Sequence, residues 1–235
     1  MATGTASIQI EYPESDGLSM GESDLHSFWV FYVRCLLEHR FRGQQNYITS
    51  NLALYFVEGD PRTYIVPDVF MVKDHPSEMR GVYKLWEEQK APNVAFEITS
   101  HSTHREDLAK IPKYQLIGVA ELFLFDPTGS YLTPSLQGFR LGKCDYLAIP
   151  RDRKGNLYSR ELDANLGLKD RELVLIDSKS GNRWLTAEEA AEAEREVAAA
   201  AREAAEFERD AERIRSKKLE EEVSRLRDKL RKLLD

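Results

Sequence analysis

The chain of 235 residues is long enough for one globular domain with an appendage, and a hydrophobic fraction of 42% supports a packed core. Its net charge of −7 is unlike that of most nucleic-acid-binding proteins, and no stretch approaches the roughly 20 apolar residues of a membrane helix. The two cysteines, Cys35 and Cys144, form no paired motif, which argues against a disulfide scaffold or a Cys-based zinc site. Because the N-terminus also lacks the pattern of a signal peptide, we expect a cytoplasmic protein.

The first predicted element is an amphipathic helix that begins near Ser23 and ends before Gly43. Its apolar residues recur at helical spacing: Leu25, Phe28, Trp29, Tyr32, Val33, Leu36 and Leu37. Glu22 and His26 lie at its start. For both residues, a capping or surface role and a place near a functional site remain open.

Three short apolar runs bounded by turn residues predict strands of a central sheet, at 64–72, 94–99 and 121–125. A further run at 47–57 precedes a strong turn, and we expect it to pair with 64–72 as a hairpin. A helix over about 105–117, which contains Pro112, separates the last two runs. A strand–helix–strand crossover of this kind predicts a mixed sheet with some parallel pairing.

Two of these strands carry one acid each, Asp68 and Glu97, among hydrophobic neighbours. A carboxylate in such a place is costly to bury unless it is paired or binds a metal. Two acids on neighbouring strands can share one hard cation, which prefers oxygen ligands. The alternative is that Asp68 closes a turn after Pro67 and that Glu97 faces solvent.

The second half of the chain has many turn signals and short strand-like runs up to about residue 182, which predict small hairpins beside the core. After Trp184 a long helix rich in Ala, Glu, Arg and Lys begins, and we place the domain boundary between a core at 1–183 and a helical extension at 184–235. The apolar residues of its last part follow the 4-3 spacing of a coiled coil: Leu219, Val223, Leu226, Leu230 and Leu233. This spacing favours self-association, with a solvated single helix as the alternative.

Taken together, these segments resemble the Uma-type family of restriction-endonuclease-like proteins, within the PD-(D/E)XK nuclease superfamily. The resemblance spans residues 15–180. The matching residues are Asn51–Leu52, Val66–Phe70, Tyr83–Glu88, Ala91–Pro92, Glu97–Ser100, Ser102–Thr103, Glu106–Leu108, Tyr114, Gly118–Val119, Glu121, Phe125–Pro127 and Leu136–Gly138.

The resemblance implies a divalent cation, Mg²⁺ or Mn²⁺, held by Asp68, Glu97 and the main-chain carbonyl of Ile98. The superfamily also places a lysine two residues after the second acid, where this chain has Thr99. In the Uma-like branch a lysine of the following helix takes this role, and Lys110 matches it best. The spacing leaves Lys113 as a rival, and a surface salt bridge between Lys110 and Glu106 is the alternative role for Lys110.

Other catalytic schemes find no support, since the chain has no nucleophile elbow and no phosphate-binding glycine loop. His101 and His104 suit capping or substrate contacts better than zinc binding. We therefore expect an α/β fold with a restriction-endonuclease-like core, a mixed β-sheet flanked by helices and a long C-terminal helix. The expected function is metal-dependent hydrolysis of DNA by a homodimer. The alternative is a non-catalytic binding or scaffold module that self-associates through its coiled coil.

Overall fold

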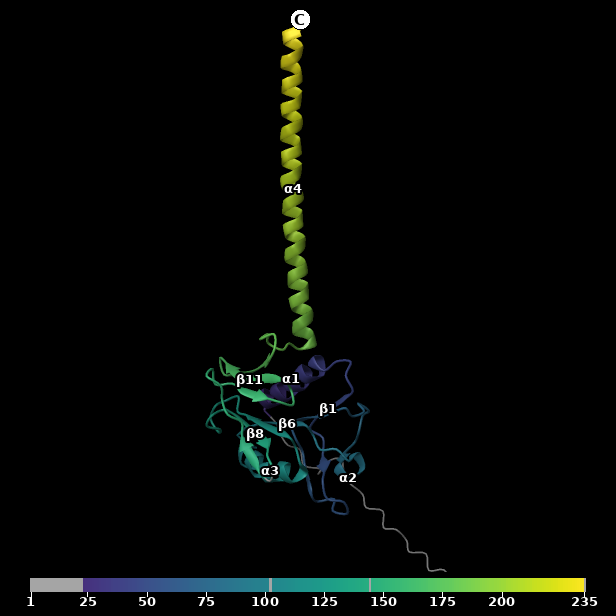
Figure 1. Ribbon diagram of the computed structural model, residues 1–235, viewed down its shortest axis with the longest axis vertical. Helices are drawn as coiled ribbons and strands as arrows, with labels where there is room; N and C mark the ends of the chain where they lie inside the picture. Colours follow the sequence, from purple (N-terminus) through teal and green to yellow (C-terminus); the bar gives the residue numbers. More distant parts are fainter. Residues whose placement is uncertain (1–22, 102, 144, 235) are drawn as a thin grey trace, which may run out of the picture. The chain divides into compact units, whose positions relative to one another are not determined.

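The computed structural model describes residues 23–101, 103–143 and 145–234. The core is a six-stranded sheet of order β1-β4-β6-β7-β8-β9 (Figure 1). Its strands are β1 (Asn46–Ser50), β4 (Val69–Lys73), β6 (Val94–Ile98), β7 (Glu121–Phe125), β8 (Leu136–Leu141) and β9 (Tyr146–Ala148). Among the described residues of this sheet, β6 and β7 alone pair in parallel, and α3 (His104–Ile117) connects them. The predicted mixed sheet is confirmed.

One face of this sheet packs against helix α1 (Asp24–Arg40), which Ser23 caps. Trp29 and Val33 of the helix pack against Met71 of β4 and Phe96 of β6 in one hydrophobic cluster, the α1-side cluster. A small sheet extends the same cluster with β10 (Leu157–Ser159), β11 (Ala164–Lys169) and β12 (Glu172–Asp177). Figure 1 shows α1 and β11 together on this side of the sheet.

Alternate strand residues point to opposite sides of the sheet, and the residues on the second side pack against α3. Phe70 and Ala95 share a second cluster with Tyr114 and Ile117 of the helix. The other elements on this side are β2 (Leu54–Tyr55), β3 (Tyr64–Ile65), β5 (Tyr83–Lys84) and the short α2 (Leu85–Glu88). The central strands are therefore buried on both faces, which explains why their sequences read as continuous apolar runs.

The segment 47–57 differs from its prediction as a single strand. β1 pairs with β4 as expected of a hairpin, but the chain turns at Asn51, which adopts a φ of 51°. A left-handed residue interrupts the extended backbone, and β2 then pairs with β3 and β5 in a separate sheet. Asn tolerates this conformation better than most residues.

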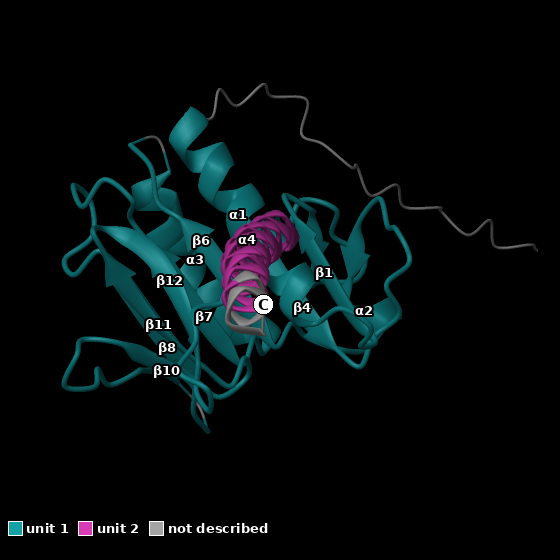
Figure 2. Ribbon diagram, turned by 90° about the horizontal axis from the view of Figure 1, so that it is seen from above, with its two compact units in different colours: residues 1–186 teal, residues 187–235 magenta. Residues whose placement is uncertain are grey.

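The chain divides into two compact units, residues 1–186 and 187–235 (Figure 2). Trp184 is 5% exposed and lies in the α1-side cluster, with its ring 5.9 Å from that of Phe41 and beneath the guanidinium of Arg40. Its backbone N–H donates to the carbonyl of Leu175. We therefore propose that the folded domain extends to Thr186 rather than ending at residue 183.

The second unit is one helix, α4 (Ala187–Leu234), of 48 residues. Its sequence contains no Gly or Pro to interrupt it. None of the helices in the described parts of the chain is long and apolar enough to cross a membrane.

Candidate metal and phosphate site

Strand register brings the two predicted acids together. In the antiparallel pair of β4 and β6, Val69 lies opposite Phe96, and one further step of the same register sets Asp68 opposite Glu97. Residues at such positions have Cβ atoms about 5 Å apart. The carboxylate of Asp68 also spans the two strands, because its Oδ2 accepts the backbone N–H of Ile98 at 2.6 Å.

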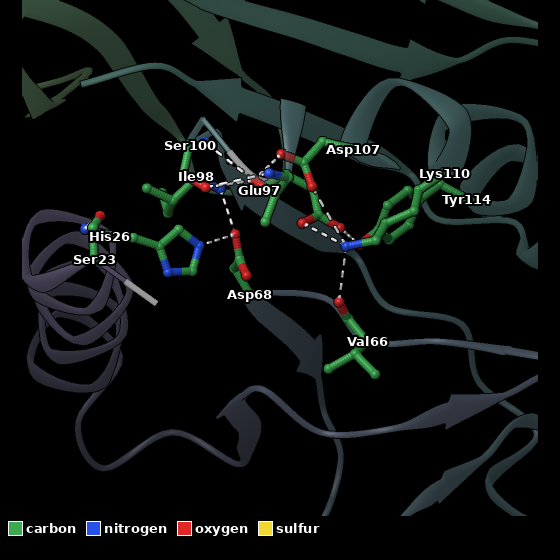
Figure 3. Close-up of polar contacts among 11 residues, drawn as sticks. Ser23, His26, Val66, Asp68, Glu97, Ile98, Ser100, Asp107, Lys110 and Tyr114 are labelled. Carbon is green, nitrogen blue, oxygen red and sulfur yellow. Dashed lines mark hydrogen bonds and ion pairs between the residues drawn. The ribbon is translucent and has the colours of Figure 1, made fainter. Parts of the chain in front are cut away.

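Glu97 is fully buried and points toward α3. Phe96 and Ile98 both belong to the α1-side cluster, so the side chain between them faces the other way. Its Oε2 lies 3.2 Å from the Lys110 amine, and its Oε1 accepts a short hydrogen bond from the Tyr114 hydroxyl (Figure 3).

Lys110 is the lysine that reaches this acid, whereas Lys113 is exposed. The two residues are three apart and Pro112 lies between them, but α3 presents only the face of Lys110 and Tyr114 to the sheet. The Lys110 amine also donates to the carbonyl of Val66, 3.3 Å away. It is 9% exposed and forms ion pairs with Glu97 and Asp107, whereas Glu106, its partner in the alternative surface salt bridge, is exposed.

A third acid, Asp107, belongs to the same cluster and was missed as a site residue. It is 1% exposed; its Oδ1 lies 3.5 Å from the Lys110 amine, and its Oδ2 accepts a hydrogen bond from Thr103 at 2.9 Å. Its spacing from Lys110 could have indicated this position, because residues three apart on a helix share a face. The alternative surface salt bridge of Lys110 involved Glu106, the residue before Asp107.

His26 approaches the cluster from the first turn of α1. Its Nε2 lies 3.2 Å from Asp68 Oδ2, and its backbone N–H donates to the Ser23 side chain, which caps the helix. Figure 3 shows the imidazole directed at Asp68. The structure thus places His26 beside the site, and Glu22 lies outside the described residues.

Three buried carboxylates and one lysine leave this cluster with excess negative charge. Burial, followed by repulsion from Asp68, raises the pKa of Glu97 well above its usual range, although Lys110 opposes this. Burial likewise raises the pKa of Asp107 to about 6. Burial alone would lower the pKa of Lys110, but Glu97, Asp107 and Asp68 outweigh it and raise that pKa, so the amine stays protonated.

This imbalance fits a divalent cation, which would neutralise the excess charge. Asp68, Glu97 and the Ile98 carbonyl offer the hard oxygen donors that Mg²⁺ and Mn²⁺ prefer. Among the described residues no three His, Cys, Asp or Glu side chains are grouped as metal ligands. Keeping several waters is usual for Mg²⁺.

The two histidines after β6 lie beside an aromatic residue. The His104 ring stacks on Tyr131 at a centroid distance of 5.0 Å, and the His101 ring meets the edge of the same tyrosine at 5.9 Å. His104 Nδ1 also contacts the His101 carbonyl at 2.9 Å. His101 lies in the loop after β6 and His104 is the first residue of α3, and both rings contact Tyr131 in the loop that follows β7.

Residues 7–171 match the model of the Uma2 family, described as "Putative restriction endonuclease". A solved structure of a putative nuclease of the DUF820 family from Anabaena variabilis is similar at 15% identity, with a TM-score of 0.45 over 60% of this chain and 75% of that chain. No curated protein matches the sequence at a significant level.

Proposed function

This chain belongs to the Uma2 family of nuclease-like proteins, and from that premise we propose that it is a metal-dependent endonuclease that hydrolyses DNA phosphodiester bonds. The observation that carries the proposal is the buried ion pair between Glu97 and Lys110 beside Asp68. A buried lysine surrounded by an excess of carboxylates is expensive to maintain for stability alone. This arrangement of one lysine among several carboxylates suits a site that must bind a cation and a phosphate.

Asp68, Glu97 and the Ile98 carbonyl would hold Mg²⁺ or Mn²⁺. When bound, the cation would supply Lewis acidity at the scissile phosphate and charge stabilisation at the leaving oxygen. His26 orients Asp68 through Oδ2, and Tyr114 orients Glu97 through Oε1. Both acids are thus held in position before any substrate arrives, which reduces the cost of ordering them.

Lys110 takes the place of the lysine that the superfamily pattern sets at residue 99. Its protonated amine would orient the attacking water and counter negative charge that develops on the phosphate. Asp107 and the Val66 carbonyl hold this amine at the site. The substitution of Thr99 for the strand lysine is therefore compensated from α3.

We propose DNA as the substrate although the chain is acidic overall, because the buried acids contribute to that total and local charge decides phosphate binding. The two cysteines form no paired motif in the sequence, which suits a cytoplasmic setting. We further propose that two copies associate through α4, whose coiled-coil spacing motivated that expectation.

Cleavage of supercoiled plasmid with Mg²⁺ or Mn²⁺ tests the enzymatic proposal. Asp68→Asn and Glu97→Gln should abolish cleavage, because each removes a ligand charge with little change in size. Lys110→Ala should reduce the rate by about 10²-fold, the usual scale for losing one electrostatic stabiliser of a transition state. Lys113→Ala is the matched control and should retain the wild-type rate, because its side chain is exposed.

Calorimetric titration with Mn²⁺ provides a readout independent of turnover. Asp68→Asn and Glu97→Gln should weaken binding of the ion, and Lys110→Ala should not. Cleavage that persists in Asp68→Asn would contradict the proposed site. A wild-type protein that binds DNA without cutting it under either metal would instead support the non-catalytic binding module.

A further inference from the structure

Helix α4 presents an apolar stripe to solvent. Every side chain from Glu192 to Arg227 is exposed, including several large apolar ones: Val197, Phe207, Ile214, Leu219, Val223 and Leu226. At about 1.5 Å per residue, its 48 residues extend for about 70 Å. Most helical stability comes from packing an apolar face, so an uncovered stripe of this length calls for a partner.

The stripe has two sections with heptad spacing. In the first, a and d positions fall on Val197, Ala200, Ala204, Phe207, Ala211 and Ile214; in the second, on Leu219, Val223 and Leu226, and the sequence continues with Leu230 and Leu233. A groove beside the second section is lined by Ser216, Leu219, Glu220, Val223, Ser224 and Arg227. Such a groove is suited to receive apolar side chains of a facing helix.

We infer that the occupant of this stripe is the same stripe of a second copy, aligned parallel and in register. The inference rests on the proposed self-association and adds the orientation of the chains. Val223 at an a position between Leu219 and Leu226 at d positions is the combination that favours parallel two-stranded coils.

The step between the two sections supports the same register. Ile214 and Leu219 both take d positions but are five residues apart instead of seven, so the heptad phase shifts by two residues between them. Two parallel chains in register make this shift at the same level, and large residues then face large ones along the whole seam. Each Phe207 would pack against its own counterpart, as would each Leu226.

Charges beside the seam are complementary in this arrangement. In a parallel coil the residue before an a position lies near the residue five further along in the other chain. Glu222 would therefore face Arg227 of the second copy, and Asp210, which precedes Ala211 at an a position, would face Arg215 of the second copy. By symmetry each attraction occurs twice.

An antiparallel pairing of full-length helices is less favourable electrostatically. The antiparallel register that covers both sections sets Leu226 against Ala204 and Val223 against Phe207. It also brings Glu222 near Asp210 and Glu220 near Glu208, which are like charges at close range. In the parallel register Glu222 faces Arg227 and Asp210 faces Arg215, and the one like-charge pair given by the same rule is Glu203 with Glu208 of the second copy.

Single cysteines test the orientation, in a Cys35→Ser/Cys144→Ser background. Parallel chains in register should form disulfide-linked dimers with Ala204→Cys and with Leu226→Cys, since a disulfide needs Cα atoms within about 7 Å. Ala205→Cys, one residue off the seam, is the matched control and should stay reduced. A mixture of Ala204→Cys and Leu226→Cys should give only homotypic links.

Charge exchange tests the same register without cysteine. Glu222→Arg should raise the dimer Kd about tenfold, because two attractions become repulsions. The double variant Glu222→Arg/Arg227→Glu should restore wild-type affinity. Glu221→Arg makes the same charge change one residue away, off the seam, and should leave the Kd within about twofold.

Sedimentation equilibrium of the full chain separates the outcomes. A monomer mass at 100-µM scale concentrations, about 10⁻⁴ M, would overturn both the self-association and the orientation, and leave the nuclease assay unaffected. A dimer that gives heterotypic Ala204–Leu226 links, or that the double charge exchange fails to restore, would overturn the parallel register while self-association stands.

Discussion

At the scale of single residues, the candidate site accepts unfavourable electrostatics. Asp68, Glu97 and Asp107 converge on Lys110 in a buried setting, and burial raises the pKa values of Glu97 and Asp107. Repulsion of this kind lowers the stability of the fold, and it is the type of arrangement found where function rather than stability selects residues.

Asp107→Asn should therefore separate stability from activity. Burial raises the pKa of Asp107 to about 6. The carboxylate form, which predominates above that pH, is therefore destabilised in the folded state relative to the unfolded chain. Removing the charge should raise the free energy of unfolding by about 1–2 kcal/mol at pH 8 in metal-free buffer. It should also lower kcat about tenfold, less than Lys110→Ala, because the lysine loses one of the groups that hold it.

Glu106→Gln is the control for this change, since it removes the charge of the neighbouring exposed acid. Its effect on unfolding should stay within about 0.5 kcal/mol. Urea denaturation and plasmid cleavage measure the two quantities. A less stable Asp107→Asn protein with unchanged kcat would contradict the positioning role of Asp107.

Asp126 anchors the loop after β7 and should make stability depend on acid. Burial alone would raise its pKa, but the N–H groups of Tyr131 and Leu132 and the bonds from Thr128 outweigh that effect and lower it. A lowered pKa stabilises the fold above the unfolded value of about 3.9, and this contribution is lost as the pH falls through the folded value.

Asp126→Asn should accordingly cost about 2 kcal/mol at pH 7, the scale of hydrogen bonds to a charged group. The difference between wild type and variant should shrink below about pH 4. Asp170→Asn, at an exposed turn residue, is the matched control and should show neither effect. Unfolding curves at pH 7, 5 and 3 provide the measurement; a difference that stays constant with pH would rule out a charge effect.

At the scale of elements, helix α3 determines which lysine serves the site. This helix packs on the face of the sheet to which Glu97 points. A lysine of α3 can therefore reach Glu97 in place of the strand lysine of the superfamily pattern. Three contacts of the helix converge on this point, from Asp107, Lys110 and Tyr114.

The C-terminal limit of the folded domain can be tested with two truncations. A chain ending at Thr186 should unfold at nearly the wild-type temperature, because it keeps both clusters of the core. A chain ending at Asn182 loses Trp184 and should be less stable by about 3–5 kcal/mol, the cost of removing a large buried side chain. Thermal unfolding of the pair, followed by near-UV circular dichroism, distinguishes them. If the two truncated chains are equally stable, the C-terminal boundary of the folded domain lies at residue 183.

At the scale of the whole molecule, pairing through α4 would join two catalytic domains to one coil. A tethered second site acts at a high effective concentration once the first has bound DNA. The wild-type dimer should therefore convert supercoiled plasmid to linear product with little nicked intermediate. Glu222→Arg, diluted below its dimer Kd, should accumulate nicked plasmid, and Glu221→Arg should behave as wild type. Identical product ratios at all concentrations would show that pairing does not coordinate the two cuts.

Local sequence was sufficient for much of this protein. The buried strands, the crossover helix, the acid just before β4 and the acid on β6 follow from short apolar runs and their spacing, because strands covered on both faces need such runs. The long α4 likewise follows from composition and the absence of Gly and Pro. These features depend on neighbours in the chain, so the sequence displays them directly.

Other features were decided only by tertiary contacts. The choice of Lys110 over Lys113 and the addition of Asp107 depend on which face of α3 meets the sheet. The division of 47–57 at Asn51 depends on a second sheet that forms with β3 and β5. Each outcome is set by residues that are distant in sequence and whose packing outweighs local preference. Residue spacing alone therefore does not predict these outcomes.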